Sequence, residues 1–102
     1  MQKHNVADFK SFFKVLQTGT QTQTAIMTLK PGEASGAKSN EHPQSDQVLL
    51  VLEGELKAEI GEELTTLVKG DVVIVPAGVD HRFSNESLLA ASTFNVYGPP
   101  AY

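Results

Sequence analysis

A series of short β-type segments, most of them separated by turns that contain glycine or proline, is the feature that most restricts this chain's fold. The segments lie at residues 13–18, 22–30, 47–52, 55–60, 64–68, 72–75, 81–85 and 88–97. In the second segment, Ala25, Met27 and Leu29 share one face, and threonines dominate the other. The third segment is apolar on both faces, which is typical of a strand covered on both sides. This regular spacing predicts an all-β sandwich or barrel.

The length of 102 residues suits one small domain with one core. No repeat, linker or low-complexity tract divides the chain, so we expect a single domain over residues 1–102. Helix signals are weak and are confined to the stretch VADFKSFF near the start. We therefore interpret residues 1–12 as a lead-in segment that precedes the first strand.

Composition excludes several classes of function. The formal net charge is −4 and no cluster of Lys or Arg forms a basic surface, so we expect no nucleic-acid partner. No apolar stretch approaches the roughly 18 residues that a membrane span needs, so we expect no membrane partner. The chain has no cysteine, which rules out disulfides, thiol nucleophiles and cysteine metal ligands. The start of the chain lacks an apolar signal core, and we expect a cytoplasmic protein.

The most specific pattern is the stretch GDVVIVPAGVDHRFSN at residues 70–85. Pro76 cannot donate a hydrogen bond to a neighbouring strand and so ends the run of valines and isoleucine before it. Gly78 can adopt the positive φ that a return turn often requires. The spacing of Gly70, Pro76, Gly78, His81 and Asn85 is G-x5-P-x-G-x2-H-x3-N, and it resembles the second motif of the cupin superfamily at every fixed position.

The stretch GAKSNEHPQSDQVLLVLEG at residues 36–54 resembles the first cupin motif, G-x5-H-x-H-x3 or 4-E-x6-G. Counting back from Gly54 puts Gln47 at the glutamate position, His42 at the second histidine and Asn40 at the first. The upstream glycine is out of register, with Ala34 in its place. The resemblance covers residues 30–97, with a complete second motif and a first motif that departs at two of its three ligand positions.

The resemblance implies a double-stranded β-helix, a small barrel of two packed sheets. It also implies a divalent transition metal (Fe, Ni, Mn, Zn or Cu) held by Asn40, His42, Gln47 and His81. The two histidines are strong ligands, whereas the amides of Asn40 and Gln47 are weak and neutral. Strand alternation would put Asn40 and His42 on one face and turn Glu41 away from it.

Two interpretations of function follow. In the first, the barrel binds a small molecule, with an anion as one option, through a weak metal site at His42 and His81, with oxygenase-, isomerase- or lyase-like chemistry. In the second, the barrel is a metal-free binding, sensing or structural module without catalysis, and its histidines are polar lining residues. Whether the protein is an enzyme stays open. Met27, Phe83 and Phe94 are expected in the core that lines the pocket, and we expect a homodimer.

Overall fold

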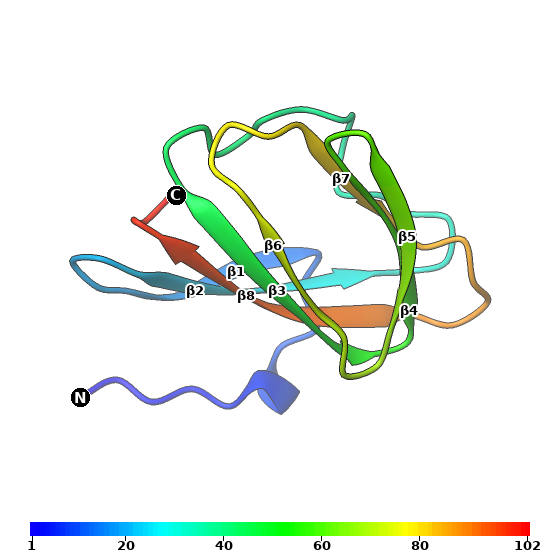
Figure 1. Cartoon of the computed structure of the whole chain (residues 1–102). Coiled ribbons are helices and arrows are strands. Elements are labelled where there is room, and N and C mark those ends of the chain that lie inside the picture. Colours follow the sequence, from blue (N-terminus) through cyan, green and yellow to red (C-terminus); the bar gives the residue numbers. More distant parts are fainter.

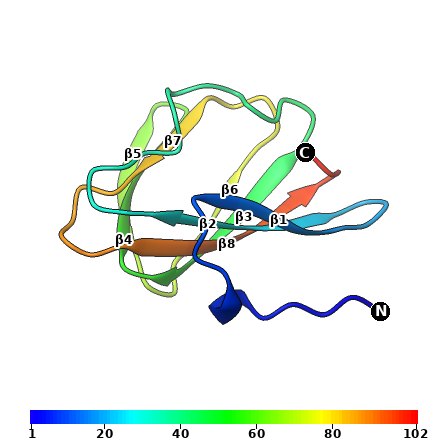
Figure 2. The same cartoon turned by 180° about the vertical axis from the view of Figure 1, so that it is seen from behind.

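The strands fold into a barrel, as Figures 1 and 2 show from opposite sides. The structure is a computed structural model and describes residues 1–102. A short 3-10 turn, η1 (Val6–Asp8), precedes the first strand. The strands are β1 (Phe13–Thr18), β2 (Gln23–Leu29), β3 (Asp46–Glu53), β4 (Glu55–Ile60), β5 (Glu63–Val68), β6 (Val72–Val75), β7 (His81–Ser84) and β8 (Ala91–Gly98). The prediction of an all-β chain is confirmed.

The strands form two antiparallel sheets. The larger sheet has the order β1-β2-β8-β3-β6, and the smaller has the order β5-β4-β7. Strand β3 lies in the larger sheet, β4 and β5 lie in the smaller sheet, and β6 returns to the larger one. The chain therefore crosses from one layer to the other and back. No helix of the protein has the length and apolar character needed to cross a membrane.

Side-chain alternation along each strand separates the interior from the outside. Leu49 and Val51 of β3 are buried, and their neighbours Val48 and Leu50 are only partly covered. The same alternation runs along β8. The inward residues of both sheets meet in one cluster of ten buried residues: Met27, Leu29, Leu49, Val51, Leu56, Ala58, Leu67, Val75, Phe83 and Ala91.

The last strand begins later than the sequence predicts, at Ala91 instead of Leu88. The side chain of Asn85 explains the difference, because its amide donates to the carbonyls of Leu29 and Leu89. Its Oδ1 also accepts from the backbone and hydroxyl of Ser87. These bonds hold residues 86–90 in a loop, and asparagine is a residue that stabilises turns in this way.

The turn between β3 and β4 depends on Gly54. This residue has a φ of +80°, a region that glycine adopts without steric cost. A Cβ atom there would lie 2.7 Å from the carbonyl oxygen of Ala90 and 2.8 Å from the Cα of Ala91. The connection between the two sheets therefore passes too close to the start of β8 to accept any side chain.

Candidate ligand pocket and histidine pair

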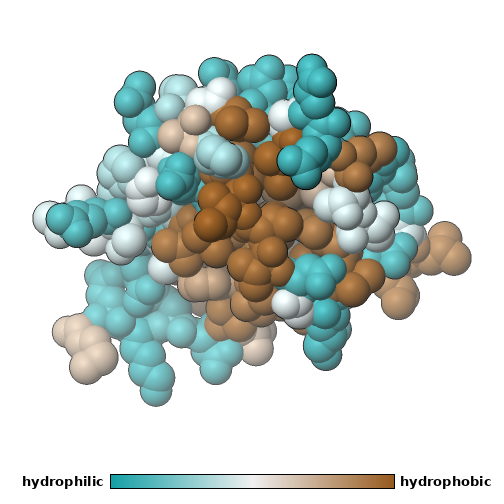
Figure 3. Space-filling model, in the orientation of Figure 1, coloured by the Kyte–Doolittle hydropathy of each residue, from teal (hydrophilic) through white to brown (hydrophobic).

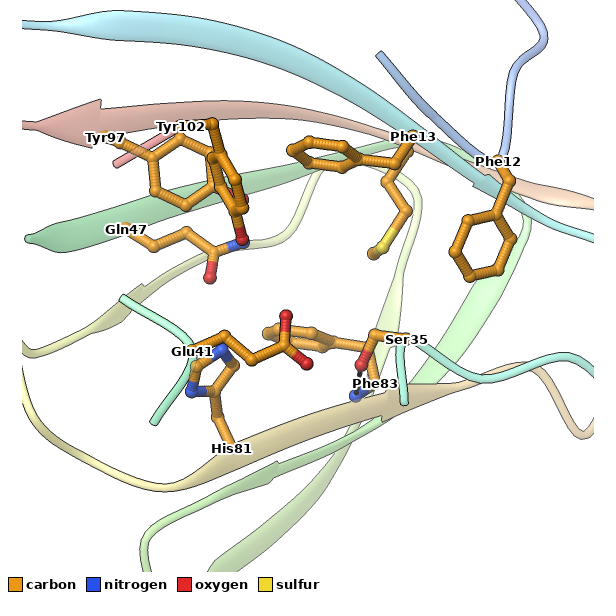
Figure 4. Close-up of a pocket in the computed structure, with 10 residues that line it drawn as sticks. Phe12, Phe13, Ser35, Glu41, Gln47, His81, Phe83, Tyr97 and Tyr102 are labelled. Carbon is orange, nitrogen blue, oxygen red and sulfur yellow. Dashed lines mark hydrogen bonds between the residues drawn. The ribbon is translucent and has the colours of Figure 1, made fainter. Parts of the chain in front are cut away.

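A pocket of about 200 Å³ lies between the sheets, inside the barrel. Figure 4 shows side chains from several elements converging on it. Its lining is mainly apolar and aromatic, with a few polar groups, which is the usual character of a small-molecule site. The lining residues are Phe12, Phe13, Met27, Ser35, Glu41, Gln47, His81, Phe83, Tyr97 and Tyr102.

The two histidines of the cupin-like motifs lie side by side. His42 comes from the loop before β3 and His81 from the first position of β7, and both are buried. Their ring centroids are 4.5 Å apart. The Nδ1 atom of His42 lies 2.9 Å from the carbonyl oxygen of Ser45, and that of His81 lies 3.0 Å from the carbonyl oxygen of Val79. A carbonyl accepts only, so a proton on Nδ1 of each ring is the tautomer that satisfies these two contacts.

A buried chain of hydrogen bonds leads from His42 into the barrel. The Nε2 atom of His42 lies 2.8 Å from Oε1 of Gln47. The amide of Gln47 donates to Oδ1 of Asn95, and the amide of Asn95 donates to Oγ1 of Thr93. The hydroxyl of Thr93 donates to the backbone carbonyl of Met27. The chain thus joins β3, β8 and β2 and satisfies polar groups that would otherwise be buried without partners.

The carbonyl of Met27 is an acceptor, and this fixes the direction of the bonds that lead from it back to Gln47. The carbonyl of Met27 requires a donated proton from Thr93, so Asn95 and Gln47 must each donate toward Thr93. Gln47 Oε1 then faces His42 as an acceptor. In a neutral His42 that donates through Nδ1, Nε2 also has only a lone pair. In this tautomer two lone pairs meet 2.8 Å apart, and a proton on Nε2 instead would leave Nδ1 facing the Ser45 carbonyl without a hydrogen. A cation bound at Nε2 would satisfy both contacts.

The structure places Asn40 and Glu41 differently from the strand-based expectation. Asn40 is exposed and does not line the pocket, whereas Glu41 does line it and lies beside His81 in Figure 4. The expected alternation fails because Glu41 and His42 lie in a bend and residues 40–42 form no strand. The expectation that Glu41 points away is wrong, and the pocket contains one carboxylate.

Burial changes the titration of the pocket's polar groups. Desolvation lowers the pKa of His81, assisted by the nearby His42, while the Val79 carbonyl and the carboxylates of Glu41 and Asp80 oppose that shift. His81 is therefore neutral at pH 7, with its unprotonated Nε2 available as an acceptor or ligand. Desolvation also raises the pKa of Tyr97 and of Tyr102, and the charge of Glu41 adds to both shifts. Both phenols stay protonated and can donate a hydrogen bond.

Tyr102 forms part of the pocket wall because Gln23 holds residues 101 and 102 in place. Oε1 of Gln23 accepts from the backbone amides of Ala101 and Tyr102, and its amide donates to the Tyr102 carbonyl. The Tyr102 ring packs against Phe13 and Tyr97, with centroids 4.8 and 5.2 Å away. Sequence reasoning missed Tyr102, Phe12, Phe13 and Ser35, since no motif marks these positions.

Of the expected lining residues, Met27 and Phe83 line the pocket and Phe94 does not. Phe94 lies between buried Thr93 and Asn95 on β8, so its side chain is on the opposite face of the sheet. The expectation for Phe94 is corrected on this ground. Two of the inward positions of β8 hold the polar residues Thr93 and Asn95, which an apolar pattern cannot predict.

The donor set accommodates a divalent transition metal only in part. No group of three or more His, Asp or Glu side chains forms a ready-made metal site. Two imidazoles with unprotonated Nε2 atoms would be available, each with its Nδ1 oriented by a backbone carbonyl, as metal-binding histidines commonly are. The Oε1 atom of Gln47 adds an oxygen ligand that lies next to Nε2 of His42, so both atoms could bind one cation between them. Glu41 is the one acid of the lining that could offset the charge.

Comparison with known proteins assigns the family. The cupin domain family matches residues 25–97, and the chain belongs to it. Its barrel is a double-stranded β-helix. The chain is 32% identical over 90 residues to the uncharacterized protein L612 of Acanthamoeba polyphaga mimivirus, covering 84% of this chain and 55% of that protein. The chain thus spans about half the length of the curated relatives it matches.

Solved structures share the same barrel. The protein BH2720 of Bacillus halodurans superposes with a TM-score of 0.87 and 25% identity, covering 95% of this chain and 76% of the other. A sugar phosphate isomerase of the cupin superfamily from Silicibacter pomeroyi superposes with a TM-score of 0.72 and 26% identity, covering 85% and 59%. These similarities assign the chain to the cupin fold.

Proposed function

We propose that this cupin binds a small organic molecule in the pocket beside His81 and that a divalent metal ion takes part in the binding. His42 and His81 would hold the ion through Nε2, and Gln47 would add its amide oxygen. The observation that carries this proposal is the contact of 2.8 Å between His42 Nε2 and Gln47 Oε1. A cation bound at this contact would be attracted to the lone pairs of both atoms. Asn40, which is exposed, would join only if the loop at residues 40–42 changed its conformation.

The ion would polarise an oxygen of the bound molecule, which is the chemistry it supplies in oxygenase-, isomerase- or lyase-like reactions. The chain's own residues supply the rest of the site. The rings of Phe13, Tyr97 and Tyr102 exclude water from one wall, and the phenols donate hydrogen bonds to the bound molecule. With two positive charges on the ion and one negative charge on Glu41, the pocket would remain positive. A small carboxylate or enolate is the class of ligand that fits this charge.

Metal content and its dependence on the two histidines test the proposal. The protein is prepared with Fe, Ni, Mn, Zn or Cu supplied, and the bound metal is counted by mass spectrometry after desalting. We expect close to one ion per chain, with loss in His42→Ala and in His81→Ala. His4 is the matched control, because it is the remaining histidine and lies exposed before η1. Absence of metal from the wild-type protein, or retention in both pocket variants, contradicts the proposal.

A metal-free binding module is the second candidate, and the completeness of the hydrogen-bond chain favours it. From Gln47 through Asn95 and Thr93 to the Met27 carbonyl, every member of the chain has its partner without a metal. The pocket lining then contains Glu41 and several aromatic rings but no Lys or Arg. A carboxylate beside aromatic faces favours organic cations, since these gain both charge attraction and cation–π contact.

The two candidates differ in their response to a chelator and to ligand charge. Choline and its uncharged isostere 3,3-dimethylbutan-1-ol are compared by thermal unfolding, since a ligand of the folded state raises the melting temperature. A metal-free cation site predicts that choline alone stabilises the protein, that the chelator has no effect, and that Glu41→Gln removes the difference. Stabilisation by small carboxylates that the chelator abolishes supports the metal site.

A further inference from the structure

The pocket lies between aromatic rings that come from opposite sides of the barrel. Figure 4 shows Phe13, Tyr97 and Tyr102 on one side of the pocket. His81 and Phe83, which belong to β7 of the small sheet, lie on the other side. A ligand held between the sheets therefore meets ring faces or edges from both. Such surroundings favour a flat, unsaturated molecule, because aromatic rings attract one another in offset and edge-to-face arrangements.

The pocket volume of about 200 Å³ restricts the size of that molecule. Drug-sized ligands occupy pockets of about 300–1,000 Å³. A cavity of about 150 Å³ inside a protein is enough to bind benzene, and the same proportion gives about 250 Å³ for two fused rings. The pocket therefore has room for one six-membered ring with a small substituent, whereas two fused rings exceed it.

Side chains outside the barrel cannot make this selection. Hydrophobic residues gather over β3 and β6 in Figure 3, and the exposed Val72 and Ile74 belong to them. Successive side chains of a strand point to opposite faces of the sheet. These outer side chains therefore point away from the pocket, and neither of them lines it. Selection by shape has to come from the inward rings.

Tyr102 is the one ring of the aromatic wall that no strand holds. It follows the end of β8 at Gly98, in a segment of residues 99–102 that we name the strap. Its ring packs on Phe13 and Tyr97, with centroids 4.8 and 5.2 Å away. Tyr97 is 3% exposed and Tyr102 is 53% exposed, so the Tyr102 ring lies between Tyr97 and the solvent. Movement of the strap would therefore widen the pocket and uncover Tyr97.

Gln23 fixes the strap with all of its hydrogen-bonding capacity. Its Oε1 accepts from the backbone amides of Ala101 and Tyr102, at 3.1 and 2.9 Å. Its amide donates to the Tyr102 carbonyl at 2.8 Å and to Oγ1 of Thr18 at 2.9 Å. An amide side chain has two donor hydrogens and two acceptor lone pairs, so none is left for a ligand. Gln23 is buried and does not line the pocket, so it acts on a ligand only through Tyr102.

A second attachment joins the strap to the histidine pair. The hydroxyl of Ser45 donates to the Pro99 carbonyl at 2.6 Å. The carbonyl of Ser45 also faces Nδ1 of His42. Pro99 and Pro100 restrict the strap further, since each proline ring fixes its own φ. The strap is thus held at both ends, and its ring has one defined position relative to His42.

We propose that Tyr102 is the specificity-determining residue of the pocket and that Gln23 is its positioning residue. Together they restrict the ligand to a molecule with one flat ring, and the class that fits is a small aromatic carboxylate. This inference rests on the proposed function, in which the pocket binds a small organic molecule and the metal attracts its carboxylate. The ring is selected by the shape of the pocket, with or without the metal.

Isothermal titration with two matched pairs of ligands tests the ring preference. Benzoate is compared with cyclohexanecarboxylate, which has the same charge and number of carbons but a puckered ring. Benzyl alcohol and cyclohexylmethanol repeat the comparison without charge. We expect the flat member of each pair to bind about 10-fold more tightly, since it gains ring contacts on both sides.

A chelator separates this inference from the metal of the proposed function. If the chelator weakens the carboxylates alone and the flat member of each pair still binds more tightly, both proposals are supported. If the chelator changes nothing and the flat members are still preferred, the ring selection is supported and the metal is contradicted. Equal affinities within both pairs, or no binding of any of the four ligands, overturn the ring selection.

The size limit is tested with 2-naphthoate as the larger ligand. Wild-type protein should bind benzoate about 10-fold or more tightly than 2-naphthoate, because overfilling a packed site is costly. Tyr102→Ala should remove this preference, whereas Tyr102→Phe keeps the ring and should retain the ratio between the two ligands. Gln23→Leu removes all four hydrogen bonds of the amide and should act like Tyr102→Ala.

Gln17→Leu is the matched control for Gln23→Leu. Gln17 lies on the neighbouring strand β1 and bonds to Thr24 and to the Gln2 carbonyl, away from the strap. Its substitution should leave the size preference intact. An unchanged preference in Tyr102→Ala overturns the role of Tyr102. An unchanged preference in Gln23→Leu, or an equal loss in Gln17→Leu, overturns the role of Gln23.

Tyrosine fluorescence gives a second readout that needs no ligand. The chain has two tyrosines and no tryptophan, and both tyrosines line the pocket. In Tyr102→Phe the remaining fluorophore is Tyr97, and the strap should shield it from acrylamide. Tyr102→Ala, or Gln23→Leu added to Tyr102→Phe, should raise the quenching constant several-fold, whereas Gln17→Leu added to Tyr102→Phe should not.

Circular dichroism verifies that each variant is folded before its quenching is compared. Tyr102→Ala alters a half-exposed side chain, so it keeps the proposal testable if Gln23→Leu does not fold. A quenching constant of Tyr97 that is equally low in Tyr102→Ala and Tyr102→Phe would show that the ring does not cover the pocket, and would overturn the proposal.

Discussion

The Nε2 atom of His42 lies 2.8 Å from Oε1 of Gln47, and an imidazole that donates through Nδ1 has no hydrogen for this contact. A ring proton and a metal ion cannot occupy this position together. Metal binds only to an unprotonated imidazole nitrogen, so the affinity for metal should rise with pH, as it does for histidine sites in general. This single contact connects both candidate functions.

Gln47→Glu should strengthen metal binding by about 100-fold, because a carboxylate adds a negative ligand at the contact. In metal-free protein the same change removes the donor to Asn95 and should lower the free energy of unfolding by about 1–3 kcal/mol. Isothermal titration and chemical denaturation measure the two effects. Asn40→His serves as the control, and because Asn40 is exposed we expect it to change metal affinity much less.

Two threonines should respond oppositely to substitution by valine. Thr93 accepts from Asn95 and donates to the Met27 carbonyl, so Thr93→Val should cost about 1–3 kcal/mol of unfolding free energy. The Oγ1 atom of Thr28 is buried without a partner, so Thr28→Val should be neutral or stabilising. Urea denaturation of both variants checks the prediction, and a larger loss in Thr28→Val than in Thr93→Val would refute the assigned bonds.

Gly54→Ala should destabilise the barrel more than Gly70→Ala does. Both glycines have positive φ, +80° and +92°, so both variants pay the left-handed backbone cost of about 1–2 kcal/mol. At Gly54 the new methyl group would also meet the backbone of residues 90 and 91, whereas nothing lies within 4 Å at Gly70. Comparing the melting temperatures of the two variants isolates the destabilisation caused by the steric clash at Gly54. Equal melting temperatures would show that the backbone at the start of β8 moves to accommodate the methyl group.

The unfolding free energy of metal-free protein should fall as the pH drops below about 6.5. Burial lowers the folded-state pKa of His81, so the unfolded chain binds more protons between the two pKa values. This loss of unfolding free energy is absent above the pKa of His81 in the unfolded chain and complete below its pKa in the folded protein. Denaturation with chelator present, compared with His81→Gln at each pH, isolates this contribution. A constant difference between the two proteins across the window would contradict a lowered pKa.

The sequence predicted the fold because the strand pattern is local. Alternating and doubly apolar segments, with turns such as that at Gly54, were sufficient for the all-β architecture. The motif from Gly70 to Asn85 then pointed to the cupin barrel. Strand limits were less predictable where a side chain intervenes, as Asn85 does in delaying the start of β8.

The candidate site was less predictable because it is assembled from distant segments. The motif spacing selected His42 and His81, and the structure brings them together. Side-chain alternation misplaced Glu41, since Glu41 and His42 lie in a bend, where side chains do not alternate as they do along a strand. Gln23 bonds to the backbone of Tyr102 across 79 positions of sequence and helps to hold it at the pocket, a contact that no local pattern encodes.

The large sheet is a single layer, and this has a thermodynamic consequence. Gln47 faces the pocket while its neighbour Val48 faces outward on the same strand. A bound molecule that shifts the backbone of β3 must therefore also shift the outer surface of the sheet. Because coupling between binding equilibria is reciprocal, any second molecule that binds this outer surface would change pocket occupancy by the same factor by which occupancy changes its own binding.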